Sequence, residues 1–416
     1  MIEQLQLKIN QYKAKVKDWF HKQRLLLQEN GLPLPIYSSF DIRDSGYKAA
    51  IVDSNLFPAG FNNLDEKAWD KAVISFKDYI SKIFDGSSIL IIPEAHTRNQ
   101  YYLSNLCALK RILTDSGYHV VIGSLRDDIT GDAIEVEDSN GHLLTLEKMR
   151  RYGNKIQTMS FKDGLVLLNN DFSVKKPELL DNLNQKIIPP FFLGWYHRRK
   201  STHFRYLDCL IDEFADMLDI DPWFLKTQYT VINDVNFNNQ ENLESISEKV
   251  NELLISIQEK YDQYSIDSKP YVFIKDNSGT YGMGIINASS GSEILSLNRK
   301  KRNKMLFGKQ RTRITSLMIQ EGIQTIHQVD SNPAEPVLYS VGGEVLGGFM
   351  RIHAEKNSKS SLNSPGMKFD ILLEDNITKP IINSITSDDD LSLYGILADI
   401  SNIAIGYEHR QQDEQS

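Results

Sequence analysis

The chain has 416 residues, of which 41% are hydrophobic and 25% are charged, and its formal net charge is -8 at pH 7. These values are ordinary for a globular protein of two or three domains, and they exclude the fibrous and disordered classes. The acidic balance also argues against a general nucleic-acid-binding protein, because affinity for the phosphate backbone depends on clustered Lys and Arg.

Cysteine usage and apolar patterning indicate the compartment. Cys107 and Cys209 are the only cysteines, too few for a disulfide scaffold or a four-ligand zinc site, so we expect both to be structural and the compartment to be reducing. Charges interrupt the apolar positions of the N-terminus, unlike a signal peptide, and no stretch approaches the roughly 18 apolar residues of a spanning helix. We therefore expect a cytoplasmic protein with no membrane partner.

The first 30 residues predict an amphipathic helix. Leu5, Ile9, Val16, Trp19 and Phe20 recur at helical spacing before a break at 31–35, where Gly and Pro interrupt the pattern. We expect this helix to pack on the first domain.

Residues 88–123 then predict a strand, a helix and a second strand. An apolar run at 88–92, a helical pattern over 101–115 and a second apolar run at 119–123 indicate an α/β unit, and strand-like pieces follow at 142–146 and 164–170. We predict a mixed α/β (α+β) fold whose N-terminal α/β domain, residues 1–195, binds the substrate.

The second half of the chain predicts two helices followed by antiparallel strands. Helical patterns cover 202–225 and 242–264, and strand-like segments follow at 271–276, 316–323, 335–341 and 344–352. We predict a nucleotide-binding domain over 196–408 and a frayed acidic tail over 409–416.

A glycine-rich turn follows the strand at 271–276 and suggests a phosphate-binding loop. Lys275 would place a cation beside Gly279, Gly282 and Gly284, whose bare backbone N–H groups can approach phosphate oxygens. The spacing is neither the dinucleotide fingerprint nor a P-loop. A glycine-rich hairpin without a ligand is the alternative.

Polar residues downstream extend this interpretation. Gln320 and Glu321 follow an apolar run, where they could contact adenine and ribose, and Arg351 ends a strand, where a cation could stabilise a phosphoryl group. A surface ion pair is the alternative for Arg351. Oxygen ligands suited to Mg²⁺ are Glu335, Glu355 and Asn363.

In this order, the motifs resemble the ATP-binding half of the ATP-grasp superfamily over about 200–408. Longer phrases at 41–64, 93–99, 194–204, 221–224, 274–285 and 362–369 resemble the proteobacterial glutamate–cysteine ligase family, the smaller family with an ATP-grasp-like C-terminal half. The resemblance covers nearly the whole chain. It implies that glutamate, cysteine and ATP are converted into γ-glutamylcysteine, ADP and phosphate through an acyl-phosphate, as the first step of glutathione synthesis, with Mg²⁺ as a cofactor.

The resemblance also implies residue roles. Candidate catalytic residues are Lys275 and Arg351, and candidate ATP-binding residues are Lys226, Lys275, Gly279, Tyr281, Gly282, Gly284, Gln320 and Glu321. Because glutamate needs cations for its carboxylates, the candidate substrate-binding residues are Arg43, Asn55, Asn62, Glu94, His96, Arg98, His197, Arg198 and Arg199. For these residues a solvated charge run, turn-forming asparagines and a structural histidine remain open alternatives.

Three other functions stay open at this point. A ligase with another amino-acid or peptide acceptor would share the fold. A non-catalytic nucleotide-binding regulator would have lost Lys275, Arg351 or the glycines, and none of these is lost. A dinucleotide oxidoreductase fits least, because its strand, glycine spacing and downstream acid do not occur together. The expected partners are small-molecule substrates and ATP.

Overall fold

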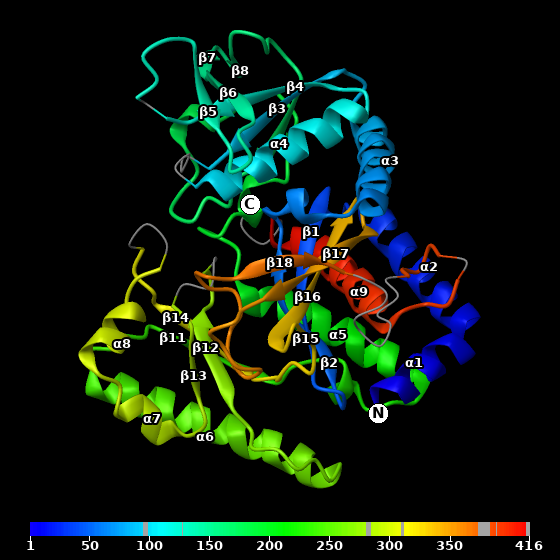
Figure 1. The fold of residues 1–416 in the computed structure, drawn as a ribbon, viewed down its shortest axis with the longest axis vertical. Helices are drawn as coiled ribbons and strands as arrows, with labels where there is room; N and C mark the ends of the chain where they lie inside the picture. Colours follow the sequence, from blue (N-terminus) through cyan, green and yellow to red (C-terminus); the bar gives the residue numbers. More distant parts are fainter. Residues whose placement is uncertain are drawn as a thin grey trace.

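The structure is a computed structural model that describes residues 1–94, 99–126, 128–279, 284–308, 312–372, 383–387 and 389–412. These residues form three main sheets with helices packed between and around them (Figure 1). The predicted mixed α/β fold class is confirmed. No helix in these ranges is long and apolar enough to cross a membrane.

The central sheet joins the beginning of the chain to its end. Its strands run in the order β18-β17-β16-β1-β2, with β15 paired to β16. They span β1 (Tyr37–Asp44), β2 (Ala49–Asn55), β15 (Gln328–Val329), β16 (Asn332–Val341), β17 (Glu344–Ile352) and β18 (Lys368–Ile371). β1 pairs with β16 in antiparallel register, Tyr37 opposite Val341. Residues on both sides of the predicted domain boundary at 195 therefore share one sheet, and that boundary stays a prediction.

A second, mostly parallel sheet lies at the top of Figure 1, with the order β10-β9-β3-β4-β6-β5. Its strands are β3 (Ser88–Pro93), β4 (His119–Ser124), β5 (Ala133–Glu137), β6 (Leu143–Lys148), β9 (Leu165–Asn169) and β10 (Ile187–Ile188). Strands β3 and β9 are almost uninterrupted apolar runs, as expected for parallel strands buried on both faces. Between this sheet and the central sheet lie α3 (Glu66–Ile83) and α4 (Gln100–Asp115), and β7 (Arg150–Tyr152) and β8 (Lys155–Gln157) form a separate hairpin.

The third sheet, called the small sheet, is antiparallel and has the order β11-β14-β12-β13. It contains β11 (Tyr229–Asn233), β12 (Val272–Asp276), β13 (Ile286–Ala288) and β14 (Ser316–Glu321). Its apolar face packs against α6 (Gln240–Gln263), and α7 (Gly291–Leu295) and α8 (Arg299–Lys304) lie nearby. The opposite face carries Lys275 and Gln320 toward the central sheet.

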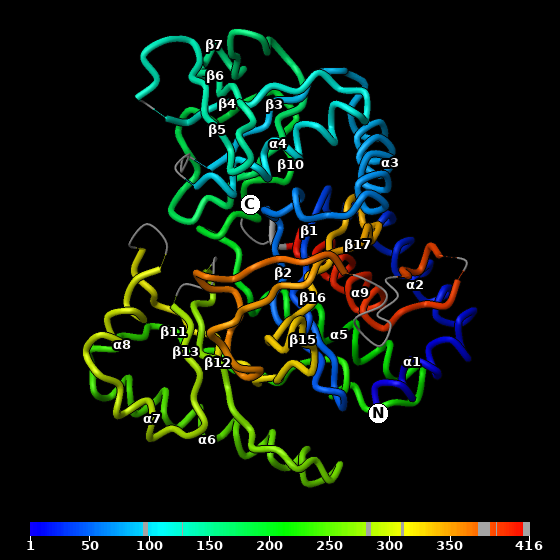
Figure 2. Tube along the Cα trace, viewed as in Figure 1, coloured from blue at the N-terminus to red at the C-terminus, as the bar shows by residue number. Residues whose placement is uncertain are grey.

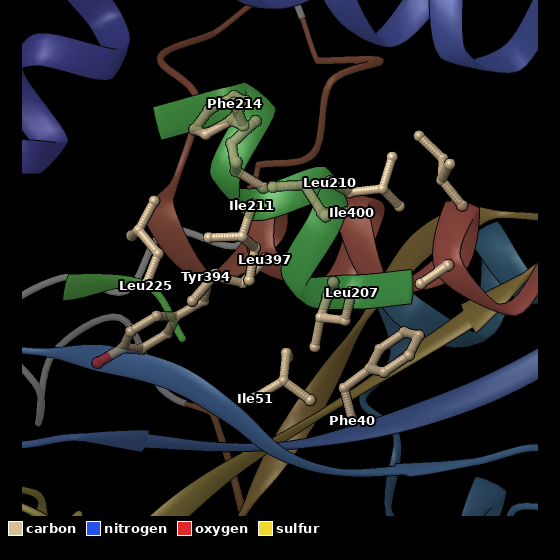
Figure 3. Packing of buried hydrophobic residues seen from close by; sticks show 14 of the residues in the cluster. Phe40, Ile51, Leu207, Leu210, Ile211, Phe214, Leu225, Tyr394, Leu397 and Ile400 are labelled. Atoms are coloured by element: carbon tan, nitrogen blue, oxygen red, sulfur yellow. The ribbon is translucent and has the colours of Figure 1, made fainter. Parts of the chain in front are cut away.

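Helices from the first and last parts of the chain pack together in one layer (Figure 2). This layer contains α1 (Ile2–Gln11), α2 (Lys13–Glu29), α5 (Lys200–Leu218) and α9 (Leu393–Glu408). Figure 3 shows Leu207, Leu210 and Ile211 of α5 facing Leu397 and Ile400 of α9. Since nearly every residue of α9 is buried, this helix is a core element rather than a surface helix.

The element predictions hold with local differences. The predicted N-terminal helix is interrupted at Tyr12, and its apolar residues belong to a core cluster that contains residues of α5 and α9 as well as of β1 and β2. The helix predicted to reach 225 ends at Leu218, because Asp219 adopts a left-handed conformation (φ 52°). Residues His409–Gln412 continue α9 as a short 3-10 helix, and the fraying of the tail stays a prediction.

Candidate active site

Two cavities lie next to each other at the central sheet, and one residue lines both. The first cavity, between the central and small sheets, is lined by Asp41, Arg43, Val52, Asp53, Lys200, Phe273, Lys275, Asp276, Gly279, Ile285, Gln320, Glu335, Ser361 and Asn363. The second cavity lies toward the parallel sheet. Its polar lining includes Asn55, Asn62, Asn63, Asn99, Asp171, Tyr339, Arg351 and Asn363. Asn363 therefore contributes to both walls.

Two lysines flank one carboxylate in the first cavity. Lys275 is 7% exposed and donates to the Val52 carbonyl at 2.8 Å, while Lys200 forms an ion pair with Asp53. Burial lowers the pKa of Lys275 to about 8, and the charge of Asp53 opposes this shift. Burial alone would raise the pKa of Asp53, but Lys200 and Lys275 hold it at about 2. Lys200 and Lys275 thus place two cations around one carboxylate, although the lining as a whole contains three cations and four acidic residues. The two lysines therefore offer local positive charge to an anionic ligand within a cavity of mixed charge.

The turn after β12 fixes the position of these lysines. Asn277 accepts from the backbone N–H of Ser201 through its side chain at 2.9 Å, and its carbonyl accepts from the N–H of Lys200 at 2.7 Å. The first turn of α5 is therefore attached to the loop that begins the glycine-rich segment. Helix α5 presents Lys200 beside Lys275 through this contact.

Arg351 and two carboxylates form the wall between the cavities. Arg351 lines the second cavity, and its Nη1 donates to Asp41 at 2.6 Å and to Glu335 at 2.9 Å, both of which line the first. Glu335 also pairs with Arg43, whose other nitrogens donate to the carbonyls of Ser358 and Ser360. Against the lowering effect of burial, Asp41 and Glu335 raise the pKa of Arg351. Arg351 is therefore a permanent cation at this wall.

The second cavity is bounded by a loop that is fixed at three consecutive residues. The Pro58 carbonyl accepts from Asn169 at 3.1 Å, and the Ala59 carbonyl accepts from the Tyr339 hydroxyl at 2.9 Å. Gly60 donates its N–H to Asn105 at 2.8 Å. Gly60 has φ +133°, and a Cβ there would lie 2.6 Å from the Tyr339 oxygen. This loop therefore holds Asn55 on one side and Asn62 on the other as a preformed, amide-rich wall.

Similarity to known proteins agrees with this geometry. The family model described as "GshA: Glutamate-cysteine ligase" matches residues 6–409. The chain belongs to the glutamate–cysteine ligase family. It is also 35% identical to the "Putative gamma-glutamylcysteine synthetase" from Methylobacillus flagellatus KT, whose crystal structure matches with a TM-score of 0.87 over 99% of this chain and 96% of that one.

The other comparisons add little. D-alanyl-alanine synthetase A from Vibrio cholerae O1 biovar eltor str. N16961 is 10% identical over 77% of this chain and 81% of that one, and its TM-score of 0.36 carries no argument about the fold. No curated protein matches. Membership of the glutamate–cysteine ligase family identifies the chain as a ligase, with ATP-dependent chemistry that joins glutamate to cysteine.

The structure brings together about half of the predicted ligase residues. Those that line the first cavity are Arg43, Lys275, Gly279, Gln320, Glu335 and Asn363, and those that line the second are Asn55, Asn62, Arg351 and Asn363. Tyr281, Gly282, His96 and Arg98 lie outside the described residues. The roles of all these residues stay predictions.

Several predicted nucleotide and metal residues lie away from both cavities. Glu321 is buried and accepts from Lys48 at 2.6 Å, so its side chain is directed to an internal ion pair. Lys226 pairs with Asp212 in a surface groove, and Glu355 is exposed. Gly284 has φ +63°, a left-handed conformation that glycine adopts without strain. This conformation explains the glycine without a bound nucleotide.

Four predicted substrate residues also have other surroundings. His197 Nδ1 contacts the Phe192 carbonyl at 3.0 Å, and Arg199 donates to nearby backbone carbonyls. Glu94 is buried at the end of β3, where its N–H donates to Tyr102. Arg198 is buried against Glu408. None of these four side chains lines either cavity among the described residues.

The sequence patterns did not predict Asp41, Asp53 or Asn99 as site residues. They gave no role to Lys200, which directly follows the predicted residues His197, Arg198 and Arg199. Asp41 and Asp53 lie on paired strands with register Asp41 opposite Asp53. Their alternation with apolar residues in two adjacent short strands was the available signal. This alternation indicates that the two acidic side chains lie close together, but it does not indicate which cations they pair with.

Proposed function

We propose that the first cavity binds the phosphates of ATP and the second binds glutamate, so that the γ-phosphate and the γ-carboxylate meet beside Asn363. The observation that carries this assignment is the shared lining residue: Asn363 faces both cavities, and Arg351 stands in the wall between them. Without such a cation, a bound phosphate and a bound carboxylate would repel each other strongly. The arrangement therefore supports group transfer across the wall.

The two lysines suit a triphosphate. Lys275 and Lys200 are held together by Asp53 without ligand, so an arriving phosphate can accept from lysines that are already oriented. Gly279 lines the same cavity, and because it has no side chain, its backbone can lie close to the phosphates. Phe273 and Ile285 supply apolar surface at the same cavity for a base.

The second cavity suits a zwitterionic amino acid. Asn55, Asn62 and Asn99 offer both donors and acceptors, Asp171 offers an anion for an ammonium group, and Arg351 offers a cation for a carboxylate. The γ-carboxylate oxygen attacks the γ-phosphorus, ADP leaves, and the cysteine amine then attacks the acyl carbon and displaces phosphate. Arg351 stabilises negative charge in both steps because it stays protonated throughout.

The donor set also fits Mg²⁺ delivered with ATP. Among the described residues no group of three or more His, Cys, Asp or Glu side chains is arranged to hold a metal alone. Mg²⁺ commonly binds through one or two carboxylates plus substrate phosphates, and Glu335 with Asn363 would supply such oxygens. When bound, the metal would neutralise charge on the phosphates.

Glutamate labelled with oxygen-18 in its γ-carboxylate tests this function. Incubation with ATP, Mg²⁺ and cysteine should yield ADP and phosphate that carries one label per turnover. Parallel reactions with other amino acids in place of cysteine test the acceptor. Unlabelled phosphate, or AMP as the product, would contradict the acyl-phosphate assignment, and equal rates with another acceptor would contradict the cysteine assignment.

A further inference from the structure

Strand β2 is an edge strand whose open edge is bound by cations instead of another strand. In an extended strand the carbonyls of alternate residues point to the same edge. The Val52 carbonyl accepts from Lys275 at 2.8 Å, and the Ser54 carbonyl accepts from Arg198 Nη1 at 2.8 Å. Asp53, between them, pairs with Lys200. Three successive residues of β2 are thus each held by a different cation.

Arg198 differs from the two lysines because it faces no cavity. It is 2% exposed, and its Nε and Nη2 donate to the two carboxylate oxygens of Glu408 at 2.7 and 2.9 Å. Its guanidinium also lies over the Trp195 ring, 4.9 Å from the centroid. A guanidinium bound bidentately by a carboxylate is fixed in orientation as well as in charge.

Glu408 is the last residue of α9 and is 1% exposed. Besides Arg198, it contacts His203 Nδ1 at 2.8 Å, and His203 Nε2 contacts Ser401 at 3.1 Å. Burial alone would raise the pKa of Glu408, but Arg198 and His203 lower it to about 2. The carboxylate is therefore charged at neutral pH, and Arg198 has a full counter-charge inside the core.

The atoms that Arg198 holds lie directly behind both cavities. Ser54 separates Asp53, which lines the first cavity, from Asn55, which lines the second. Trp195, under the guanidinium, lines the second cavity as well. A displacement of the Ser54 carbonyl would therefore move one residue of each cavity.

We propose that Arg198 and Glu408 are positioning residues of the ligase: the ion pair holds the Ser54 carbonyl and Trp195 so that Asn55 faces glutamate. This proposal rests on the assignment of glutamate to the second cavity. Arg198, predicted from sequence to bind substrate, thus acts through β2. Glu408 joins the site although it lies 353 residues from Asn55.

Kinetics of Glu408→Gln test the pair. The amide keeps the shape but removes the charge, so Arg198 loses its counter-ion and the Ser54 contact loosens. We expect the KM for glutamate to rise about tenfold or more with kcat changed less than about threefold, since a misplaced binding group mainly weakens binding that substrate and transition state share. Asp399→Asn is the matched control, because Asp399 is buried on the same helix and accepts from the Ile385 N–H instead.

A second variant separates positioning from folding. Arg198→Met combined with Glu408→Leu removes both charges, a replacement that is often neutral or stabilising for a buried pair. This variant should fold and still show the raised KM for glutamate, because nothing donates to the Ser54 carbonyl. Glu408→Asp, which keeps the charge, should recover part of the wild-type KM.

An unchanged KM for glutamate in the folded double variant would overturn the proposal. So would a Glu408→Gln enzyme whose kinetic changes equal those of Asp399→Asn, because the pair would then serve stability alone. Failure of the proposed function is a separate result: wild-type enzyme would release phosphate without oxygen-18 label, and no variant is needed to observe it.

Discussion

The two cavities are lined by different kinds of polar side chain. The first cavity holds full charges that neutralise one another before any ligand arrives, as Lys200 and Asp53 do. The second holds neutral amides with one cation, Arg351, and one acidic residue, Asp171. A polyanion is attracted by cations that lie close together, whereas an amino acid carries both signs and is recognised by groups of either polarity. If the proposed assignment is right, the density of full charges distinguishes the nucleotide cavity from the amino-acid cavity.

The largest effect should come from removing a cation of the first cavity. Lys275→Ala should lower kcat/KM for ATP by about 10²–10³, the loss typical of one preorganised electrostatic group. Steady-state ADP release measures it. Lys22→Ala is the matched control, because Lys22 lies on α2, lines neither cavity and forms an exposed pair with Asp18. Near-normal turnover of ATP by Lys275→Ala would contradict the assignment of Lys275 to phosphate binding.

A smaller effect should follow from removing an amide of the second cavity. Asn55→Ala deletes a hydrogen bond to a charged substrate, so the KM for glutamate should rise roughly 10- to 100-fold. The KM for ATP should stay within about threefold if the cavities bind separate substrates. Equal increases in the two KM values would contradict the division between the cavities.

The pH dependence sharpens the same contrast. Burial lowers the pKa of Lys275 to about 8, so the free enzyme loses this cation as pH rises through 8, and the cation is fully present below it. We expect kcat/KM for ATP to fall by up to about tenfold per pH unit above 8, since this parameter reports ionisations of the free enzyme. Lys275→Arg keeps its charge and should show no such fall. A pH profile that is identical in both enzymes would contradict the assignment.

The smallest effect is expected at Glu355. This residue was predicted to bind metal, yet it is exposed and lines neither cavity. Glu355→Gln should change the Mg²⁺ concentration that gives half-maximal activity by less than about twofold, as for an ordinary surface substitution. Glu335→Gln is the informative comparison, because Glu335 lines the first cavity. A large effect at Glu355 alone would reverse the metal assignment.

Local sequence patterns predicted the site residues that lie next to strand-forming or turn-forming residues along the chain. Lys275 stands between an apolar strand and glycines, and Asn55 and Asn62 flank a Pro-Gly turn. Glu321 was predicted by the same reasoning, but its ribose-binding role depended on a free carboxylate, and Lys48 from the other half of the chain pairs with it. A local pattern cannot show a partner 273 residues away.

The elements of the fold also differ in whether local sequence patterns predict them. Periodicity predicted β3, α4 and β4, because each is a long element with a regular apolar pattern. It could not predict that β1 pairs with β16, since antiparallel pairing of distant strands depends on tertiary packing. Through this pairing Arg351 meets Asp41, so the wall between the cavities was not predictable from sequence.

The most direct test is a crystal structure with a non-hydrolysable ATP analogue, Mg²⁺ and glutamate. We expect phosphate oxygens within hydrogen-bond distance of Lys275 Nζ and Lys200 Nζ, and the γ-carboxylate of glutamate beside Asn363 and Arg351. The groove at Lys226 is the alternative location, because it is also lined by lysines and by Trp223. A nucleotide bound in that groove, or glutamate in the first cavity, would contradict the assignment of the two cavities.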